Sequence, residues 1–188
     1  MTNATIWEHG SFYKDSFKTF EEGAERPSDL AGDLIIDLAT FEAHDWSSHE
    51  DRLGLIVHAG DDIEAIAAKL DAFDLIVVDF PSFADGRAFS IARLIRDKYE
   101  FDGEIRAKGA YILDQMPLLQ RCGVSTFEIS SDAVKTGLER GAWPDVPRYY
   151  QFALDGEGNQ ARVRHVDAKR PWLSVNIVAE GVAERSAA

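Results

Sequence analysis

The stretch DLIVVDFPSFADGRAFSIARLIRDKYEFDGEIRAKGAYILDQMPLLQRCGVSTFEI, residues 74–129, carries the pattern that decides the fold. Its first apolar run, Leu75–Val78, has no polar alternation, which is typical of a strand buried on both faces. A turn containing glycine then opens a segment with apolar residues at helical spacing, which leaves Arg93, Arg96 and Asp97 away from the apolar side. Two shorter strand candidates follow, Glu104–Ala107 and Thr126–Ile129. The stretch therefore predicts strand, helix, strand, helix and strand.

Two further strand candidates, Leu34–Leu38 and Leu55–His58, precede this stretch, and a helix is predicted to begin at Asp61 with a capping box completed by Glu64. Strands that alternate with helices across short loops predict an α/β fold with a parallel sheet and right-handed crossovers. Two closures fit this pattern: a doubly wound, flavodoxin-like sheet, or a curved half-barrel of the kind from which TIM barrels are built. Both place ligand-binding loops at the carboxyl ends of the strands.

The chain divides into three predicted parts. With 188 residues, of which 45% are hydrophobic, it can bury one core, which we expect in residues 32–150. Residues 1–31 form an N-terminal segment with irregularly spaced aromatic residues and are expected to pack as an arm or hairpin over the core. Residues 151–188 form a C-terminal extension with a flexible end, in which the turn Asp155–Gly158 predicts a hairpin.

The composition excludes several classes of function. The formal net charge of −13 argues against a nucleic-acid partner, because binding to phosphate needs clustered lysine and arginine. No apolar run approaches the length that crosses a bilayer, and the N-terminus lacks a secretory signal, so we expect a soluble, cytoplasmic protein without a membrane partner. The composition does not indicate an oligomeric state.

Cysteine usage limits the redox chemistry. Cys122 is the only cysteine, so the sequence predicts neither an intrachain disulfide nor a cysteine-bound iron–sulfur cluster, and no C-x-x-C-H haem attachment is present. The cofactor is left unknown, and a redox role would need a bound cofactor or the redox centre of a partner. Cys122 precedes Gly123 at the predicted end of a helix, so we expect a buried thiol that reacts slowly.

The loop of residues 79–87 is the leading candidate for a ligand site. It leaves a buried strand and enters a helix, so backbone N–H groups and the positive end of the helix dipole face its occupant. An anion such as sulfite, sulfate or phosphate suits this environment, and the candidate residues are Phe80, Ser82, Asp85, Gly86 and Arg87. In the alternative, structural interpretation, Asp85 caps the helix and Arg87 pairs with Asp79 or Asp114.

Arg106 is expected at the carboxyl end of the next strand. Because neighbouring parallel strands end at the same edge of a sheet, its guanidinium could converge with that of Arg87 on one bidentate anion. An ion pair of Arg106 with Asp79 or Glu128 is the equally weighted alternative.

Three polar residues complete the candidates at this edge. Asp114 and Gln115 open the following helix, where Asp114 is predicted to be a cap rather than a base, and Gln115 either reads a ligand amide or bonds to the neighbouring loop. His58 is the one histidine expected to reach this edge, and a structural role is favoured for it. The histidines lack the spacing of a zinc site, so no metal is predicted.

Familiar phosphate and nucleophile motifs are missing. The chain contains no G-x-x-x-x-G-K-S/T, no G-x-G-x-x-G and no G-x-S-x-G. Asp79 occupies the position of a response-regulator phosphoacceptor, but Asp37 stands alone where such proteins have an acidic pair. None of these enzyme classes is therefore predicted.

Several short motifs occur together in this chain: Phe80-Pro81, Phe83–Ser90, Ala92–Leu94, Gly103–Ala107, Asp114-Gln115, Arg121–Gly123 and Phe127-Glu128. In combination they resemble an uncharacterised bacterial family, domain of unknown function 934. The resemblance covers residues 32–150. In that family the gene commonly lies beside genes of assimilatory sulfite reduction, and members are often labelled oxidoreductases of that pathway.

Two functions follow as expectations. The resemblance implies an accessory or electron-transfer adaptor of assimilatory sulfite reduction with sulfite reductase as its partner, and we favour this function slightly. The alternative is a small α/β enzyme or sensor that binds a sulfur oxyanion or a phosphorylated metabolite at the Phe80–Arg87 loop. Whether the protein is an enzyme is left open.

Overall fold

The structure is a computed structural model that describes residues 4–20 and 31–144. The predicted C-terminal extension and its hairpin lie outside the described residues. In the described part, eight strands belong to one sheet: β1 (Thr5–Glu8), β2 (Ser11–Lys14), β3 (Lys18–Thr19), β4 (Leu34–Ile36), β5 (Leu53–Val57), β6 (Leu75–Phe80), β7 (Glu104–Gly109) and β8 (Thr126–Glu128). The helical segments are α1 (Leu38–Ala43), α2 (Ile63–Ala67), η2 (Leu70–Ala72), α3 (Arg87–Arg93), η3 (Leu94–Lys98), η4 (Leu113–Gln115), α4 (Met116–Arg121) and α5 (Asp132–Glu139).

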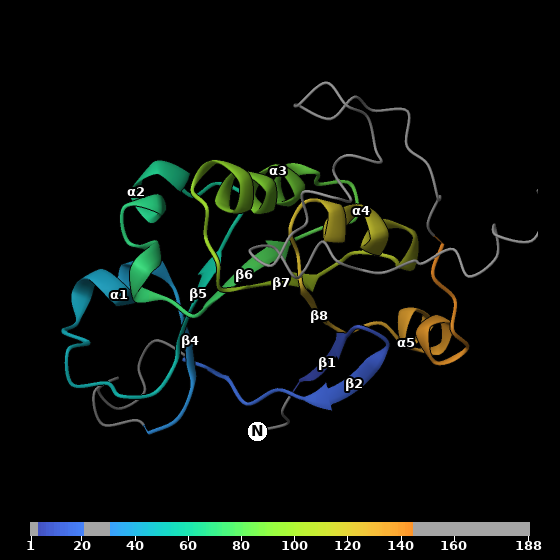
Figure 1. Cartoon of the computed structure of the whole chain (residues 1–188), viewed down its shortest axis with the longest axis horizontal. Coiled ribbons are helices and arrows are strands. Elements are labelled where there is room, and N and C mark those ends of the chain that lie inside the picture. Colours follow the sequence, from blue (N-terminus) through green and yellow to red (C-terminus); the bar gives the residue numbers. More distant parts are fainter. Residues whose placement is uncertain (1–3, 21–30, 145–188) are drawn as a thin grey trace, which may run out of the picture. The chain divides into compact units, whose positions relative to one another are not determined.

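The sheet is mostly parallel and curls into a half-barrel (Figure 1). Its strand order is β2-β1-β8-β7-β6-β5-β4-β3, with β3 to β8 parallel and β1 antiparallel to both β2 and β8. The five predicted core strands, now β4 to β8, lie parallel and in sequential order, as expected for a half-barrel. A flavodoxin-like sheet would place its second strand outside the first, and that order is not seen.

A short strap shows why the sheet must curl. We use this name for residues 15–17, which connect Lys14 at the end of β2 to Lys18 at the start of β3, although β2 and β3 are opposite edges of the sheet. Seven strand spacings in a flat sheet would span about 34 Å, whereas the four residue steps of this connection reach at most about 14 Å. The edges therefore approach each other, and the strap crosses the open side of the curled sheet (Figure 1).

The two faces of the sheet bury different residues. On the outer face, alternate residues such as Ile76, Val78 and Phe80 join the core beneath the helices. On the inner face, Phe17 of the strap packs with a small apolar cluster of Ile35, Leu75 and Val77. Side chains alternate between the two faces of a sheet along each strand. Charged residues two positions from Val77 on β6, and their register partners on neighbouring strands, therefore also lie on the inner face.

The N-terminal segment forms a hairpin, one of the two arrangements expected for it, and extends the sheet. β1 and β2 pair through a turn at His9 and Gly10, which have positive φ angles of 45° and 87°. Trp7 of β1 stacks on Trp143 with ring centroids 4.9 Å apart and meets Phe127 of β8 edge-on at 5.8 Å. These aromatic contacts fix the hairpin to the outer core.

Caps move two element boundaries from their predicted positions. β4 ends at Ile36, before the predicted Leu38, because Asp37 caps α1 and its Oδ1 accepts a hydrogen bond from Thr40 N at 2.7 Å. Asp62, not Asp61, caps α2, with Oδ1 2.9 Å from Glu64 N. Asp61 instead accepts from the backbone N–H of His58 at 2.7 Å, which shapes the turn after β5.

One predicted solvent-facing arginine is buried. The sequence pattern leaves Arg96 away from the core, yet Arg96 is 2% exposed. It lies in η3, a π-helical turn, and the extra residue in each π turn rotates the following side chains relative to an ideal α-helix. This rotation brings Arg96 to the sheet side of the helix.

Candidate functional site

Four charged side chains form a layer at the carboxyl edge of the inner face. We call His58, Asp79, Lys108 and Glu128 the carboxyl-edge layer. His58 directly follows β5, and the others lie near the carboxyl ends of β6, β7 and β8. Asp79 and Lys108 are direct register partners on neighbouring strands. Each of these residues continues the inner-face alternation, so four consecutive strands place one charged group at the same edge.

The layer consists of a histidine–carboxylate pair and a lysine–carboxylate pair. His58 Nδ1 lies 3.3 Å from Asp79 Oδ2, and Lys108 Nζ lies 3.8 Å from Glu128 Oε2. The His58 side chain is 53% exposed, whereas the Glu128 side chain is 17% exposed. The His58 end of the layer is therefore open to solvent, and the Glu128 end is largely buried. The Tyr111 hydroxyl donates to the backbone oxygen of Glu128 at 2.6 Å and holds the end of β8.

These pairs have the components of general acid–base chemistry. The contact with Asp79 favours the histidine tautomer with its hydrogen on Nδ1, which leaves Nε2 of His58 as an acceptor directed away from the pair. The separation of 3.8 Å exceeds a hydrogen bond, so Glu128 does not use the N–H donors of the Lys108 ammonium. The Lys108 ammonium can therefore bind an oxygen of a ligand while a proton of the same ligand interacts with Nε2 of His58.

Burial raises the pKa of the Glu128 carboxyl above its ordinary value, although the Lys108 and Arg106 cations lower it. Asp15 and Asp79 add to the rise because negative charges nearby disfavour a second carboxylate. Glu128 therefore keeps its proton to a higher pH than an exposed glutamate and can serve as a proton donor within the layer.

Arg106 lies deeper in the half-barrel than predicted. The sequence placed it at a strand end because β7 was expected to stop at Ala107, but β7 continues to Gly109 and puts Arg106 in mid-strand. Its side chain is 1% exposed and pairs with Asp15 Oδ2 at 2.7 Å and with Glu104 Oε1 at 2.8 Å. The predicted convergence with Arg87 is therefore wrong, and so are the alternative pairs with Asp79 and Glu128.

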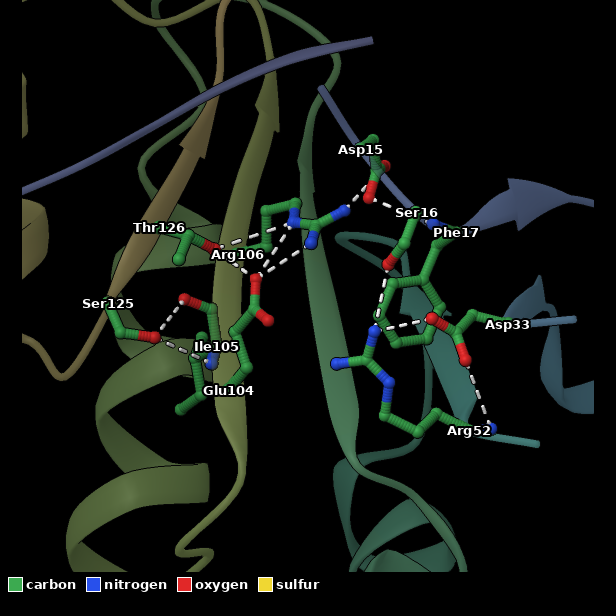
Figure 2. Close-up of polar contacts among 10 residues, drawn as sticks. All are labelled: Asp15, Ser16, Phe17, Asp33, Arg52, Glu104, Ile105, Arg106, Ser125 and Thr126. Atoms are coloured by element: carbon green, nitrogen blue, oxygen red, sulfur yellow. Dashed lines mark hydrogen bonds and ion pairs between the residues drawn. The ribbon is translucent and has the colours of Figure 1, made fainter. Parts of the chain in front are cut away.

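Two arginines hold the strap: Figure 2 shows Arg106 bonded to Asp15 and Arg52 bonded to Ser16. The guanidinium of Arg106 lies 5.5 Å from the ring centroid of Phe17, and that of Arg52 lies 4.7 Å from it. Arg52 also donates to Ser16 Oγ at 2.8 Å and pairs with Asp33. The strap thus closes the inner face directly beneath the carboxyl-edge layer.

Arg87 takes the structural role that was weighed for it, with a different partner. Its Nη2 lies 2.6 Å from Asp85 Oδ2, and its backbone N–H donates to Asp85 Oδ1 at 3.1 Å. This pairing lowers the pKa of Asp85 to about 2. Gly86, not Asp85, is the N-cap of α3, so the interpretation in which Asp85 caps this helix is wrong. Binding of an anion to this loop stays a prediction.

The other candidates of the loop differ in their burial. Phe80 is buried in the outer core, where its ring meets Phe89 and Tyr111 edge-on. Ser82 and Gly86 are exposed, and the carbonyl of Ser82 accepts from Asp85 N at 3.1 Å. Phe80 therefore supports the loop from below rather than facing it.

Gln115 joins the two loops that leave β6 and β7. Its Nε2 donates to the backbone oxygen of Phe83 at 3.4 Å, and its Oε1 accepts from Ile112 N at 3.1 Å. This agrees with the predicted bond to the neighbouring loop. Asp114 is exposed inside η4, and Ile112 occupies the cap position, so the prediction that Asp114 is a cap is wrong.

Cys122 is half-buried rather than fully buried. It follows α4, and its backbone N–H donates to the carbonyls of Leu118 and Leu119. Gly123 follows with a positive φ of 102°, as predicted for a residue that ends a helix. The slow reactivity of the thiol stays a prediction.

The sequence interpretation missed the layer because its members are far apart in the chain. His58 was expected to reach this edge and Lys108 to leave the same strand as Arg106, but neither was given a ligand role, and Asp79 and Glu128 entered as pairing partners of arginines. One signal could have found Asp79 and Lys108: each is the last inner-face residue of its strand, following Val77 and Arg106. In barrel folds, ligand-binding residues lie at the carboxyl ends of the strands. A charged residue that comes last among the inward-facing residues of its strand is therefore a candidate for this edge.

Residues 54–160 match the family described as "Bacterial protein of unknown function (DUF934)". The chain belongs to this family. The predicted resemblance to this family is confirmed, but the matched range is 54–160 rather than 32–150, and the link to sulfite reduction stays a prediction. The matched range contains all four residues of the carboxyl-edge layer but not the strap. No curated protein and no solved structure gives a significant match. None of the described helices has the length and apolar character of a bilayer-spanning segment.

Proposed function

We propose that this DUF934 protein is a small α/β enzyme or sensor that binds a sulfur oxyanion or a phosphorylated metabolite at the carboxyl-edge layer. The observation that supports the proposal is the position of a His58–Asp79 pair and a Lys108–Glu128 pair on consecutive strands of a curled, mostly parallel sheet. The carboxyl ends of such strands are the usual ligand-binding edge of half-barrels and barrels. The proposal moves the predicted anion site from the Phe80–Arg87 loop to the layer.

Each member of the layer has a distinct role in this proposal. Lys108 binds an oxygen of the oxyanion as a point charge. Asp79 orients His58, whose Nε2 accepts a proton from the ligand, in the manner of a base held by a third group. Glu128, with its raised pKa, returns a proton.

Replacing Lys108 with methionine should weaken binding of the oxyanion by about tenfold or more, since a hydrogen bond to a charged group contributes about 1.5–3 kcal/mol. Calorimetric titration of sulfite, sulfate and inorganic phosphate into full-length protein measures the effect. Lys135→Met is the matched control, because Lys135 is exposed on α5 and pairs only with Glu139 at 4.0 Å among the described residues. Equal affinities of wild type and Lys108→Met would refute the assignment.

The accessory function in sulfite reduction is the second candidate. It is supported by two exposed apolar side chains on loops that Gln115 joins: Phe83, 57% exposed, and Ile112, 42% exposed. Apolar side chains exposed on neighbouring loops suit a protein contact.

The double variant Phe83→Ser/Ile112→Ser should weaken binding to purified sulfite reductase from the same bacterium by at least tenfold if these residues are central to the contact. Surface plasmon resonance measures this affinity, and Leu118→Ser, an exposed leucine on α4, is the control. Undetectable binding of the wild-type protein would remove this candidate.

A further inference from the structure

A second hollow lies at the opposite ends of the strands from the carboxyl-edge layer. It has a volume of about 500 Å³ and is bordered by the start of β5 at Leu53 and by Asp74, just before β6. The segment after α1 supplies most of its wall. This volume lies within the usual range of small-molecule sites, about 300–1,000 Å³. We call it the amino-edge hollow.

One wall of the amino-edge hollow is aromatic and held in place. The Trp46 indole N–H donates to the backbone oxygen of Phe41 at 3.1 Å. The rings of His44 and His49 meet the indole edge-on, with centroids 6.4 Å and 6.0 Å from it. Trp46 therefore presents a fixed π-surface, which attracts cations through its quadrupole.

The charged groups of the hollow are all acidic. Asp45, Asp51 and Asp74 line it, and among the described residues no lysine or arginine does. Their carboxylates accept from backbone N–H groups of Ser47 at 3.0 Å, Gly32 at 2.6 Å and Leu53 at 3.2 Å. Within residues 4–20 and 31–144 none of the three forms an ion pair, although Asp74 interacts electrostatically with Arg52.

His49 adds an independent sign of a missing partner. Its Nε2 is buried and has no hydrogen-bond partner in the described part of the chain. A buried polar atom without a partner costs about 1–3 kcal/mol, and native structures usually satisfy such atoms through protein, water or ligand. A ligand N–H group in the hollow would supply a donor to this nitrogen.

We propose that the amino-edge hollow binds a small organic cation with N–H donors, such as a guanidinium or a primary ammonium compound. Carboxylates and the Trp46 ring attract its charge, and its N–H groups serve the acceptors of Asp51, Asp74 and His49. A metal ion is a poorer occupant, since among the described residues no three histidine, cysteine or carboxylate side chains are close enough to hold one. The hydrogen-bond acceptors are instead spread over the hollow, as the several N–H groups of an organic cation require.

The test uses agmatine and full-length protein labelled with ¹⁵N. Agmatine should shift the NMR signal of the Trp46 indole N–H saturably. Asp51→Asn should weaken its affinity about fivefold, as expected for one partly exposed charge pair, because asparagine keeps the acceptor for Gly32 N–H and removes only the charge. Asp114→Asn is the control, since Asp114 is an exposed acid in η4, at the carboxyl edge.

Three results would overturn the proposal. The first is a Trp46 shift no larger with agmatine than with sodium chloride at equal ionic strength. The second is equal weakening by Asp51→Asn and Asp114→Asn. The third is saturable binding of agmatine that shifts the carboxyl-edge layer and leaves the Trp46 signal unchanged. Signals elsewhere in each spectrum report whether the variant is folded.

Discussion

Replacing Arg106 with methionine should lower the free energy of unfolding by about 3–5 kcal/mol, because it leaves the Asp15 and Glu104 carboxylates without their cation in a buried site. Arg106 Nη1 binds the strap through Asp15, and Nη2 and Nε bind Glu104. The variant also removes the cation over the Phe17 ring. We expect the strap to loosen and the curled sheet to lose its closure.

Urea unfolding followed by circular dichroism measures this loss. Arg87→Met is the control, since the Arg87–Asp85 pair is exposed to solvent and should contribute little to stability. Adding Asp15→Asn and Glu104→Gln to Arg106→Met should recover part of the stability by removing the unpaired charges. Similar losses in Arg87→Met and Arg106→Met would mean that the buried network does not hold the strap.

Replacing Arg96 with methionine should cost about 3 kcal/mol or more, because three backbone carbonyls lose their donor. The guanidinium donates to Gly123 O at 3.0 Å, to Gly103 O at 2.9 Å and to Phe101 O. It therefore ties the end of α4 to the loop that enters β7.

The same urea experiment tests this prediction, with Arg93→Met as its control. Arg93 is exposed on the neighbouring turn and pairs with Asp97 at 3.2 Å. Methionine fills much of the arginine's volume, so the difference between the two variants reports the polar contacts. An Arg96→Met protein as stable as Arg93→Met would show that water replaces the guanidinium at no cost.

The parallel core was predictable because its signals are local. Unbroken aliphatic runs such as Leu75–Val78, followed by helical spacing and glycine turns, fix the strands and their direction. The curl was not predictable, since it depends on pairing between distant segments: β1 with β8, and β3 with β4. The strap between β2 and β3 has no local pattern that reveals which edges it joins.

The prediction of the site failed because strand β7 was predicted to end too early, at Ala107 instead of Gly109. With β7 ending at Ala107, Arg106 became a residue of the ligand edge and Lys108 a loop residue. With β7 extended to Gly109, Arg106 is an internal ion-pair partner and Lys108 faces the edge. The prediction that Arg96 faces away from the core was wrong for a related reason, because a π turn changes which face of a helix its residues occupy.

The most direct test of the carboxyl-edge layer is a titration of sulfite or inorganic phosphate into ¹⁵N-labelled full-length protein. We predict that the side-chain nitrogens of His58 and the backbone amides of Asp79, Lys108 and Glu128 shift together with one dissociation constant. This dissociation constant should rise by about tenfold or more in Lys108→Met and stay unchanged in Lys135→Met. If the amides of Gly86 and Arg87 shift instead while the layer stays unchanged, the ligand binds at the loop and the assignment of the layer is wrong.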